Sequence, residues 1–251
     1  FADKNGISRI HSVEYPHSLG LFYTSITQFL GFPNYGDEYK VMGLAPYGKA
    51  KYVEKLREII TWNNFGEYRL NMNYFTHNSR EFKTNWQNGS PYISNCFSKS
   101  LIELLGEPRG LNQKLTQKHF DIARSTQIIY EEAFFNLLNY LNIRYKSRNL
   151  CLAGGCAANS VANGKILSKT NFKSVYIQAA PGDAGGALGA AYLVYKKVKK
   201  LKPKNMSSPY LGPSYSNEFI YSELKGIPKE VLNTKRIKIF KIGDANVQDE
   251  N

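Results

Sequence analysis

The sequence has few of the features that mark membrane, secreted or disulfide-stabilised proteins. It contains no uninterrupted apolar run of about 18 residues, so we expect no transmembrane helix and no membrane partner. Its three cysteines, Cys96, Cys151 and Cys156, form no CxxC pair and are odd in number, which favours reduced thiols in the cytoplasm. The opening residues, "FADKNGISRI", have neither an initiator methionine nor the pattern of a signal peptide. We therefore expect a cytoplasmic protein and a chain that is a piece of a longer one.

Acidic residues are scarce relative to basic ones. The chain has 20 Asp and Glu against 33 Lys and Arg, a formal net charge of +13 that is compatible with polyanion binding. The lysines are mostly scattered, however, and the dense cluster at residues 195–205 is typical of the solvated end of a helix, where the dipole favours cations. We expect no nucleic-acid partner and keep a non-enzymatic, basic polyanion-binding protein as an alternative.

The first hundred residues mix helical and irregular patterns. Apolar residues at helical spacing predict a helix over residues 18–30, with Ser18 as its N-cap and Gly31 at its end. The next segments are interpreted as a glycine- and proline-punctuated loop, a short helix, and hairpins with loops: residues 36–50, 52–60 and 61–98.

A clearer pattern begins near Gln117. One face of a long predicted helix carries a stripe of mostly apolar residues: Phe120, Ala123, Gln127, Tyr130, Phe134, Leu137 and Leu141. We expect a strand, a helix, a second strand and a second helix to follow, over residues 149–153, 158–168, 174–178 and 185–197. This alternation predicts an α/β layer with a mostly parallel sheet.

Each of these two strands runs into a glycine turn that opens a helix. The turns lie in "LCLAGGCAANSVANGKIL" and "APGDAGGALGAA". Free N–H groups and the positive dipole end make such a turn an anion site, and glycine lets a phosphate approach the backbone. Asp183, at the tip of the second turn, could reach a metal or a ribose. We hypothesise that both turns hold one nucleotide; the alternative is that small residues allow close packing of helix on sheet. Neither turn matches a P-loop or GxGxxG.

Four motifs together resemble a known family. They are "EYPHSLGLFYTSITQFLGF", "GDEYKVMGLAPYG", "LCLAGGCAANSVANGKI" and "PGDAGGALGAAY", in the order of the NodU/CmcH family of carbamoyltransferases, which includes the tobramycin O-carbamoyltransferase. The resemblance covers residues 10–216. It implies that residues 1–200 are the second half of an actin-like ATPase (ASKHA, ribonuclease H-like) domain. Residues 201–216 would be a linker, and residues 217–251 the first elements of a truncated C-terminal α/β domain.

The resemblance also implies a reaction. In this family, carbamoyl phosphate and ATP form carbamoyl adenylate in the C-terminal domain. A hydroxyl of a sugar or secondary-metabolite acceptor then attacks the carbamoyl carbon in the N-terminal domain, and AMP leaves. An iron-type divalent metal is held there by two histidines of an HxxxH motif and one aspartate.

Carried onto this chain, the resemblance assigns site residues. Asp183 matches the metal-binding aspartate. The nucleotide-binding positions are Gly154, Gly155, Asn159, Gly182, Gly185 and Gly186. The acid–Glu–x–Lys stretch supplies the expected catalytic residues: Lys40 to neutralise phosphate charge, and Asp37 or Glu38 to orient or deprotonate the acceptor hydroxyl. The alternative for this stretch is a surface ion pair.

Two family signatures are missing from the sequence. It has four histidines but no HxxxH pair, and it lacks the C-terminal "EFGPRALG" signature. We therefore expect a central fragment, inactive by itself, whose remaining metal ligands lie elsewhere in the parent enzyme. An actin-like sugar kinase is the enzymatic alternative, and assembly into a homo-oligomer is left open.

Overall fold

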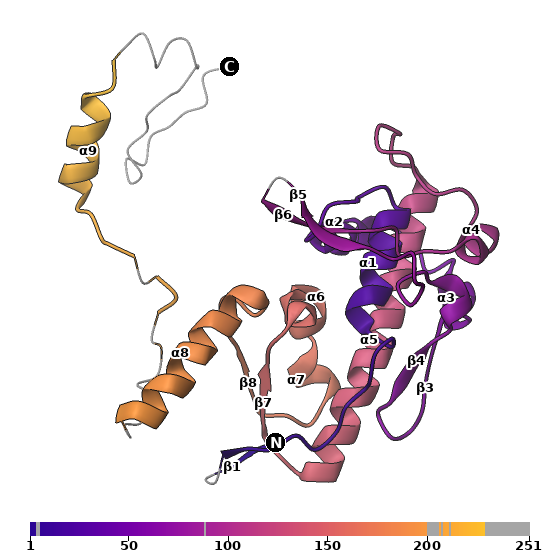
Figure 1. Cartoon of the computed structure of the whole chain (residues 1–251), viewed down its shortest axis with the longest axis horizontal. Coiled ribbons are helices and arrows are strands. Elements are labelled where there is room, and N and C mark those ends of the chain that lie inside the picture. The colour runs from indigo at the N-terminus through magenta and orange to yellow at the C-terminus, as the bar shows by residue number, and fades with distance from the viewer. Residues whose placement is uncertain (4–5, 88, 200–205, 207, 211, 229–251) are drawn as a thin grey trace. The chain divides into compact units, whose positions relative to one another are not determined.

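The computed structural model of the chain describes residues 1–3, 6–87, 89–199, 206, 208–210 and 212–228 (Figure 1). Its contacts divide the chain into two units, Phe1–Pro203 and Lys204–Asn251. In the second unit, α9 (Asn217–Lys225) begins at Ser216, whose hydroxyl oxygen accepts the N–H of Phe219 at 3.2 Å. The rest of the expected first elements of the C-terminal domain, residues 229–251, lies outside the described residues. The assignment of these units to domains of an enzyme stays a prediction.

Two helices form the centre of the first unit. The helix α1 (Leu19–Phe29) begins where Ser18 Oγ accepts the N–H of Leu21 at 3.2 Å, and it is followed by Gly31 with φ +77°. The long helix α5 (Gln117–Tyr145) packs against it, and the ring of Tyr23 meets that of Tyr130 edge-on, with centroids 5.5 Å apart. Both predicted helices are thus confirmed. The fully buried side chains at their contact include Phe22, Ile26, Phe29, Ile122, Ile129 and Tyr130.

The segment expected to be a loop at residues 36–50 is largely helical, so that prediction was wrong. It forms α2 (Glu38–Leu44) and a 3-10 helix, η1 (Ala45–Tyr47), both packed on α5. Val41 and Ala45 are buried by this packing. Pro46 sits at the start of η1, where its missing N–H costs no helical hydrogen bond. Burial against α5 therefore outweighs the local effect of glycine and proline.

Hairpins and short elements fill the region between η1 and α5, as predicted for residues 61–98. The expected helix at 52–60 is shorter than predicted, because the chain turns into a strand at the buried Ile60. Two antiparallel hairpins, β3–β4 and β5–β6, follow. The bounds of these elements and of the N-terminal β1–β2 pair are α3 Val53–Arg57, β3 Ile60–Trp62, β4 Tyr68–Leu70, η2 Met72–Tyr74, β5 Thr84–Gln87, β6 Ser90–Ile93, α4 Lys99–Leu105, β1 Ala2–Asp3 and β2 Gly6–Ile7.

After α5 the chain forms the parallel pair β7 (Asn149–Leu152) and β8 (Ser174–Ile177), which confirms the two predicted strands. The single helix expected at 158–168 was wrong. That crossover consists of η3 (Gly155–Ala158), α6 (Ser160–Asn163) and α7 (Ile166–Lys169), because Asn159 caps a new helix and Gly164 closes it. The last helix of this unit, α8 (Asp183–Lys199), begins just beyond β8 (Figure 1).

The architecture is a mixed α/β arrangement with small sheets and many helices. Within the described ranges, β7 and β8 are the one parallel pair, and the other three sheets are antiparallel pairs. The α/β class is confirmed, whereas the expected mostly parallel sheet is reduced to two strands. None of the described helices is long and apolar enough to cross a membrane.

Candidate functional site

The two glycine turns lie side by side. The carboxyl ends of parallel strands meet at one edge of a sheet, so the turns after β7 and β8 emerge together. The backbone N–H of Gly154 donates to the carbonyl oxygen of Pro181 at 2.7 Å. This bond joins the start of the first turn directly to the second turn.

A cavity of about 460 Å³ opens beside the first turn. This volume lies within the range of ordinary ligand pockets. The walls come from α1, the segment that leads into α2, α5 and the first glycine turn. They include Tyr23, Tyr35, Glu38, Tyr130, Gly155 and Asn159. The cavity thus gathers residues from the acid–Glu–x–Lys stretch at residues 37–40, called the acidic stretch below, and from the first glycine turn. These two segments are far apart in the sequence.

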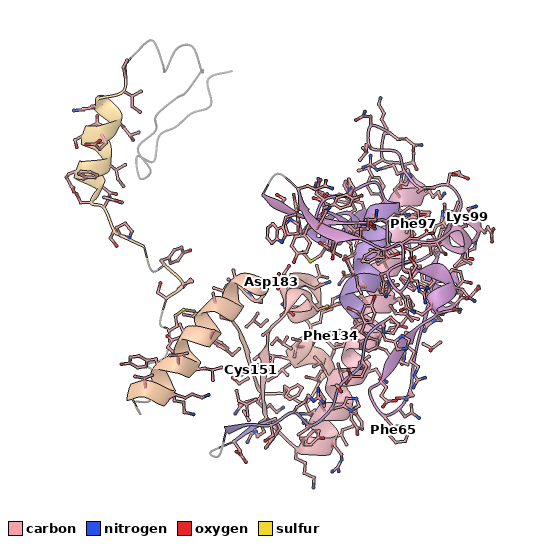
Figure 2. All side chains as sticks on the ribbon, in the orientation of Figure 1. Phe65, Phe97, Lys99, Phe134, Cys151 and Asp183 are labelled. Carbon is pink, nitrogen blue, oxygen red and sulfur yellow. The ribbon has the colours of Figure 1, made fainter. Side chains whose placement is uncertain are left out.

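Asp183 is the first residue of α8 (Figure 2). Its Oδ2 accepts a hydrogen bond from the hydroxyl of Tyr35 at 3.1 Å. This hydrogen bond is the main reason that the pKa of Tyr35 is raised. Since Tyr35 also lines the cavity, the carboxylate of the second turn stands next to the same space as the first turn.

The acidic stretch is split between two environments. Glu38 lines the cavity, and its Oε1 accepts the hydroxyl of Thr24 at 2.5 Å. Asp37 is buried and pairs with the ammonium of Lys40 at 2.7 Å. Asp37 Oδ2 also accepts the N–H of Asn34 at 3.2 Å, which ties the turn before α2 together. Glu38 therefore faces the site, whereas Asp37 and Lys40 form an ion pair outside the cavity wall.

The glycines of the two turns meet different surroundings. At Gly155, Gly182 and Gly186, a Cβ would find no described atom within 4 Å. Gly154 is equally open, but its φ of +94° is a conformation that other residues rarely adopt. At Gly185, a Cβ would lie 2.1 Å from the carbonyl oxygen of Ala180, so the fold itself requires a glycine there. Gly155, Gly182 and Gly186 leave room for a ligand to approach the backbone.

A buried carboxamide behind the first turn was not predicted as a functional residue. Gln127 is fully buried, and its amide pairs reciprocally with that of Asn159 through two hydrogen bonds of 3.1 Å. Gln127 Oε1 also accepts the hydroxyl of Tyr23 at 2.9 Å. Asn159 Oδ1 additionally caps α6 by accepting the N–H of Ala162 at 3.0 Å. The side chain of Asn159 is therefore held by the fold at the edge of the cavity. A polar residue on an otherwise apolar predicted face was the signal that could have found Gln127.

This network ends on an ion pair. Gln127 Nε2 donates to Glu131 at 2.9 Å, and the ammonium of Lys165 lies 2.7 Å from both oxygens of Glu131. Burial, followed by the charges of Glu131 and Glu38, raises the pKa of Tyr23. Burial also raises the pKa of the Cys156 thiol, so Cys156 is not an activated nucleophile. Tyr23 and Cys156 thus line the cavity as neutral groups.

The described residues do not form a metal site by themselves. No three His, Cys, Asp or Glu side chains gather in the part of the chain that the structure describes. Asp183 accepts a hydrogen bond from the hydroxyl of Tyr35. Among the described residues, it does not form a cluster with two other His, Cys, Asp or Glu side chains. Because a catalytic ion usually takes about three protein ligands, the described residues could contribute Asp183 as one of them but could not hold the ion by themselves.

Comparison with known proteins shows the family of the chain. The family model described as "Carbamoyltransferase N-terminus" matches residues 1–192, and the chain belongs to this carbamoyltransferase family. It is 41% identical over 221 residues to an uncharacterized protein of Synechocystis, covering 85% of this chain and 34% of that protein. It is 32% identical to nodulation protein NolO of Bradyrhizobium diazoefficiens, covering 84% and 35%, and 30% identical to nodulation protein NolNO of Sinorhizobium fredii, covering 80% and 26%. The chain thus spans about a third or less of the length of these relatives.

Proposed function

We propose that this chain is the part of an O-carbamoyltransferase in which the carbamoyl group reaches its acceptor. The full-length protein would make carbamoyl adenylate from carbamoyl phosphate and ATP, and transfer its carbamoyl group to a hydroxyl of a sugar or secondary metabolite. Family membership supports carbamoyl transfer. The observation that carries the site assignment is the junction of two glycine turns, one carboxylate-bearing, beside a single cavity.

In this proposal the backbone of the turns holds the adenylate. Gly155, Gly182 and Gly186 offer open approach for the phosphate, whereas Gly185 shapes the second turn. Asn159, fixed by Gln127, borders the nucleotide. Such preorganised donors stabilise the negative charge that grows on the leaving phosphate.

Glu38 is our candidate for the general base, because it is the member of the acidic stretch that lines the cavity. It would take the proton of the acceptor hydroxyl as the oxygen forms its bond to the carbamoyl carbon. The bond from that carbon to the phosphate oxygen breaks, and AMP leaves with the electron pair. Asp37 and Lys40 would act indirectly, because their ion pair would hold the turn that positions Glu38.

We also propose that Asp183 is one ligand of an iron-type divalent metal, whose remaining ligands would come from parts of the full-length protein outside this chain. When bound, such an ion would polarise the carbamoyl carbonyl as a Lewis acid. The hydrogen bond from Tyr35 would orient the Asp183 carboxylate for that task.

The test uses the full-length protein that carries this sequence. AMP release from ATP is measured in the presence of a sugar acceptor, with and without carbamoyl phosphate, in the wild type and in Glu38→Gln. We expect carbamoyl-phosphate-dependent AMP release, and a loss of transfer of roughly 10²–10⁴-fold in Glu38→Gln. Glu103→Gln, at an exposed carboxylate on α4, is the matched control and should leave the rate unchanged. Absence of AMP release would refute the proposal, and a phosphorylated sugar product would favour a sugar kinase instead.

A further inference from the structure

A second cavity, of about 360 Å³, lies against the C-terminal half of α5. It is lined by Asn64, Asn136, Asn139, Tyr140, Ile143 and Arg144. It shares no lining residue with the cavity at the glycine turns. The five α5 residues recur every three or four positions, so they form one stripe along the helix. The β3–β4 turn, which contains Asn64 and Phe65, covers this part of α5 (Figure 2).

This stripe of α5 carries polar side chains although it lies against a hairpin, a position at which a helix usually buries apolar residues. Asn136 Oδ1 is buried and has no hydrogen-bond partner among the described residues. The side chains of Asn64 and Asn139 likewise have no partner in the described part of the chain. By contrast, the amide of Asn142, on the next turn of the helix, donates to the carbonyl oxygen of Ser147 at 2.8 Å. A buried, unpaired oxygen destabilises the protein, and a ligand that donates a hydrogen bond to it would remove that cost.

The aromatic wall of this cavity is held in place. A Cβ on Gly66 would lie 2.9 Å from the ring of Tyr140, so the backbone of the hairpin rests directly on that ring. The imidazole of His11 approaches the same ring, with centroids 6.0 Å apart. Arg144 is exposed and its guanidinium lies 5.7 Å from the ring of Tyr145. Tyr140 therefore presents a fixed apolar surface beside the three carboxamides.

The combination defines the chemistry of a ligand. Carboxamides both donate and accept hydrogen bonds, as hydroxyl groups do. Among the residues that the structure describes, no Asp or Glu lines the cavity to attract a cation. A flat ring beside them suits the C–H face of a sugar ring, and the volume suits a small ligand. We propose that this cavity is an accessory binding site for a neutral saccharide unit. Asn136 follows Tyr130, a residue of the first cavity, by six positions on α5, which is about 9 Å along the axis.

The test measures saccharide binding to this chain by saturation-transfer NMR. The probes are methyl α-glucoside and maltotriose, and inorganic sulfate is titrated separately as an anionic probe. We expect weak binding of the sugars, reduced roughly tenfold by Asn64→Ala and by Asn139→Ala, the loss of one good hydrogen bond in each case. Asn85→Ala, at an exposed carboxamide on β5, is the control and should bind as the wild type does.

The variant Asn136→Leu distinguishes a role of Asn136 in ligand binding from a purely structural role. Replacing an unpaired buried amide by an apolar side chain should raise the melting temperature of the free protein while abolishing saccharide binding. No sugar binding, sugar binding that survives all three substitutions, or binding of sulfate alone would each overturn the proposal. The result is independent of carbamoyl transfer, since no residue of the first cavity is altered.

Discussion

The two glycine turns are similar in sequence but are held in different ways. The first turn ends on Asn159, whose amide is bound by the buried Gln127 and caps α6. The carboxylate of the second turn is exposed, and it contacts the segment before α2 by accepting a hydrogen bond from the hydroxyl of Tyr35. The side chain that ends the first turn is thus fixed by a buried partner in the core. The second is a surface turn whose carboxylate can be altered at little cost to the fold.

The largest effect is expected at the anchor of the first turn. Gln127→Leu leaves the hydroxyl of Tyr23 and the amide of Asn159 without their buried partner. We expect the free energy of unfolding to fall by roughly 2–4 kcal/mol in urea titrations. Gln87→Leu, at an exposed position of β5, should change it by less than about 0.5 kcal/mol. If Gln127→Leu lowered the free energy of unfolding no more than Gln87→Leu does, the distinction between the two turns would be wrong.

An intermediate effect is expected inside the second turn. Gly185→Ala places a Cβ against the backbone oxygen of Ala180, at 2.1 Å, so the backbone must move at a cost of roughly 1–3 kcal/mol. Gly186→Ala is the matched control, because its Cβ meets open space and alanine favours α8 by up to about 1 kcal/mol. Thermal unfolding should therefore shift down for the first variant and up or not at all for the second. Equal shifts would contradict the structure.

The smallest effect is expected at Tyr35. Tyr35→Phe removes one exposed hydrogen bond to Asp183, so the free energy of unfolding should fall by less than about 1 kcal/mol at pH 7. The pKa of Tyr35 is raised in the folded protein, so its contribution is present below the unfolded pKa near 10. It is lost as the pH rises through the folded value. The difference between variant and wild type should thus vanish in alkaline solution.

Elements with local signals could be predicted from the sequence. Ser18 caps α1, the apolar stripe of α5 is buried at Ala123, Tyr130 and Phe134, and the two apolar runs before the glycine turns form β7 and β8. Each of these depends on spacing or on a capping side chain. Such information is contained in a few consecutive residues.

Features that depend on distant contacts could not be predicted. The helix α2 was missed because the burial of Val41 depends on the tertiary fold, in which α2 packs on α1 and on α5, and α5 comes much later in the chain. The separation of Glu38 from the Asp37–Lys40 pair was equally hidden, since all three lie in one short stretch. The sequence identified Gln127 as a member of a buried face but not its partner Asn159. Pairing of side chains across elements is set by the tertiary fold.

The bond from the Gly154 N–H to the Pro181 carbonyl has a consequence for synthesis of the protein. A nascent chain that has emerged as far as β7 holds all of α1 and α5 and can bury their shared core. Its Gly154 amide, however, has no acceptor until β8 has paired and Pro181 has left the ribosome. The central scaffold can therefore form first, and the ligand-facing turns are joined only once Pro181 has emerged.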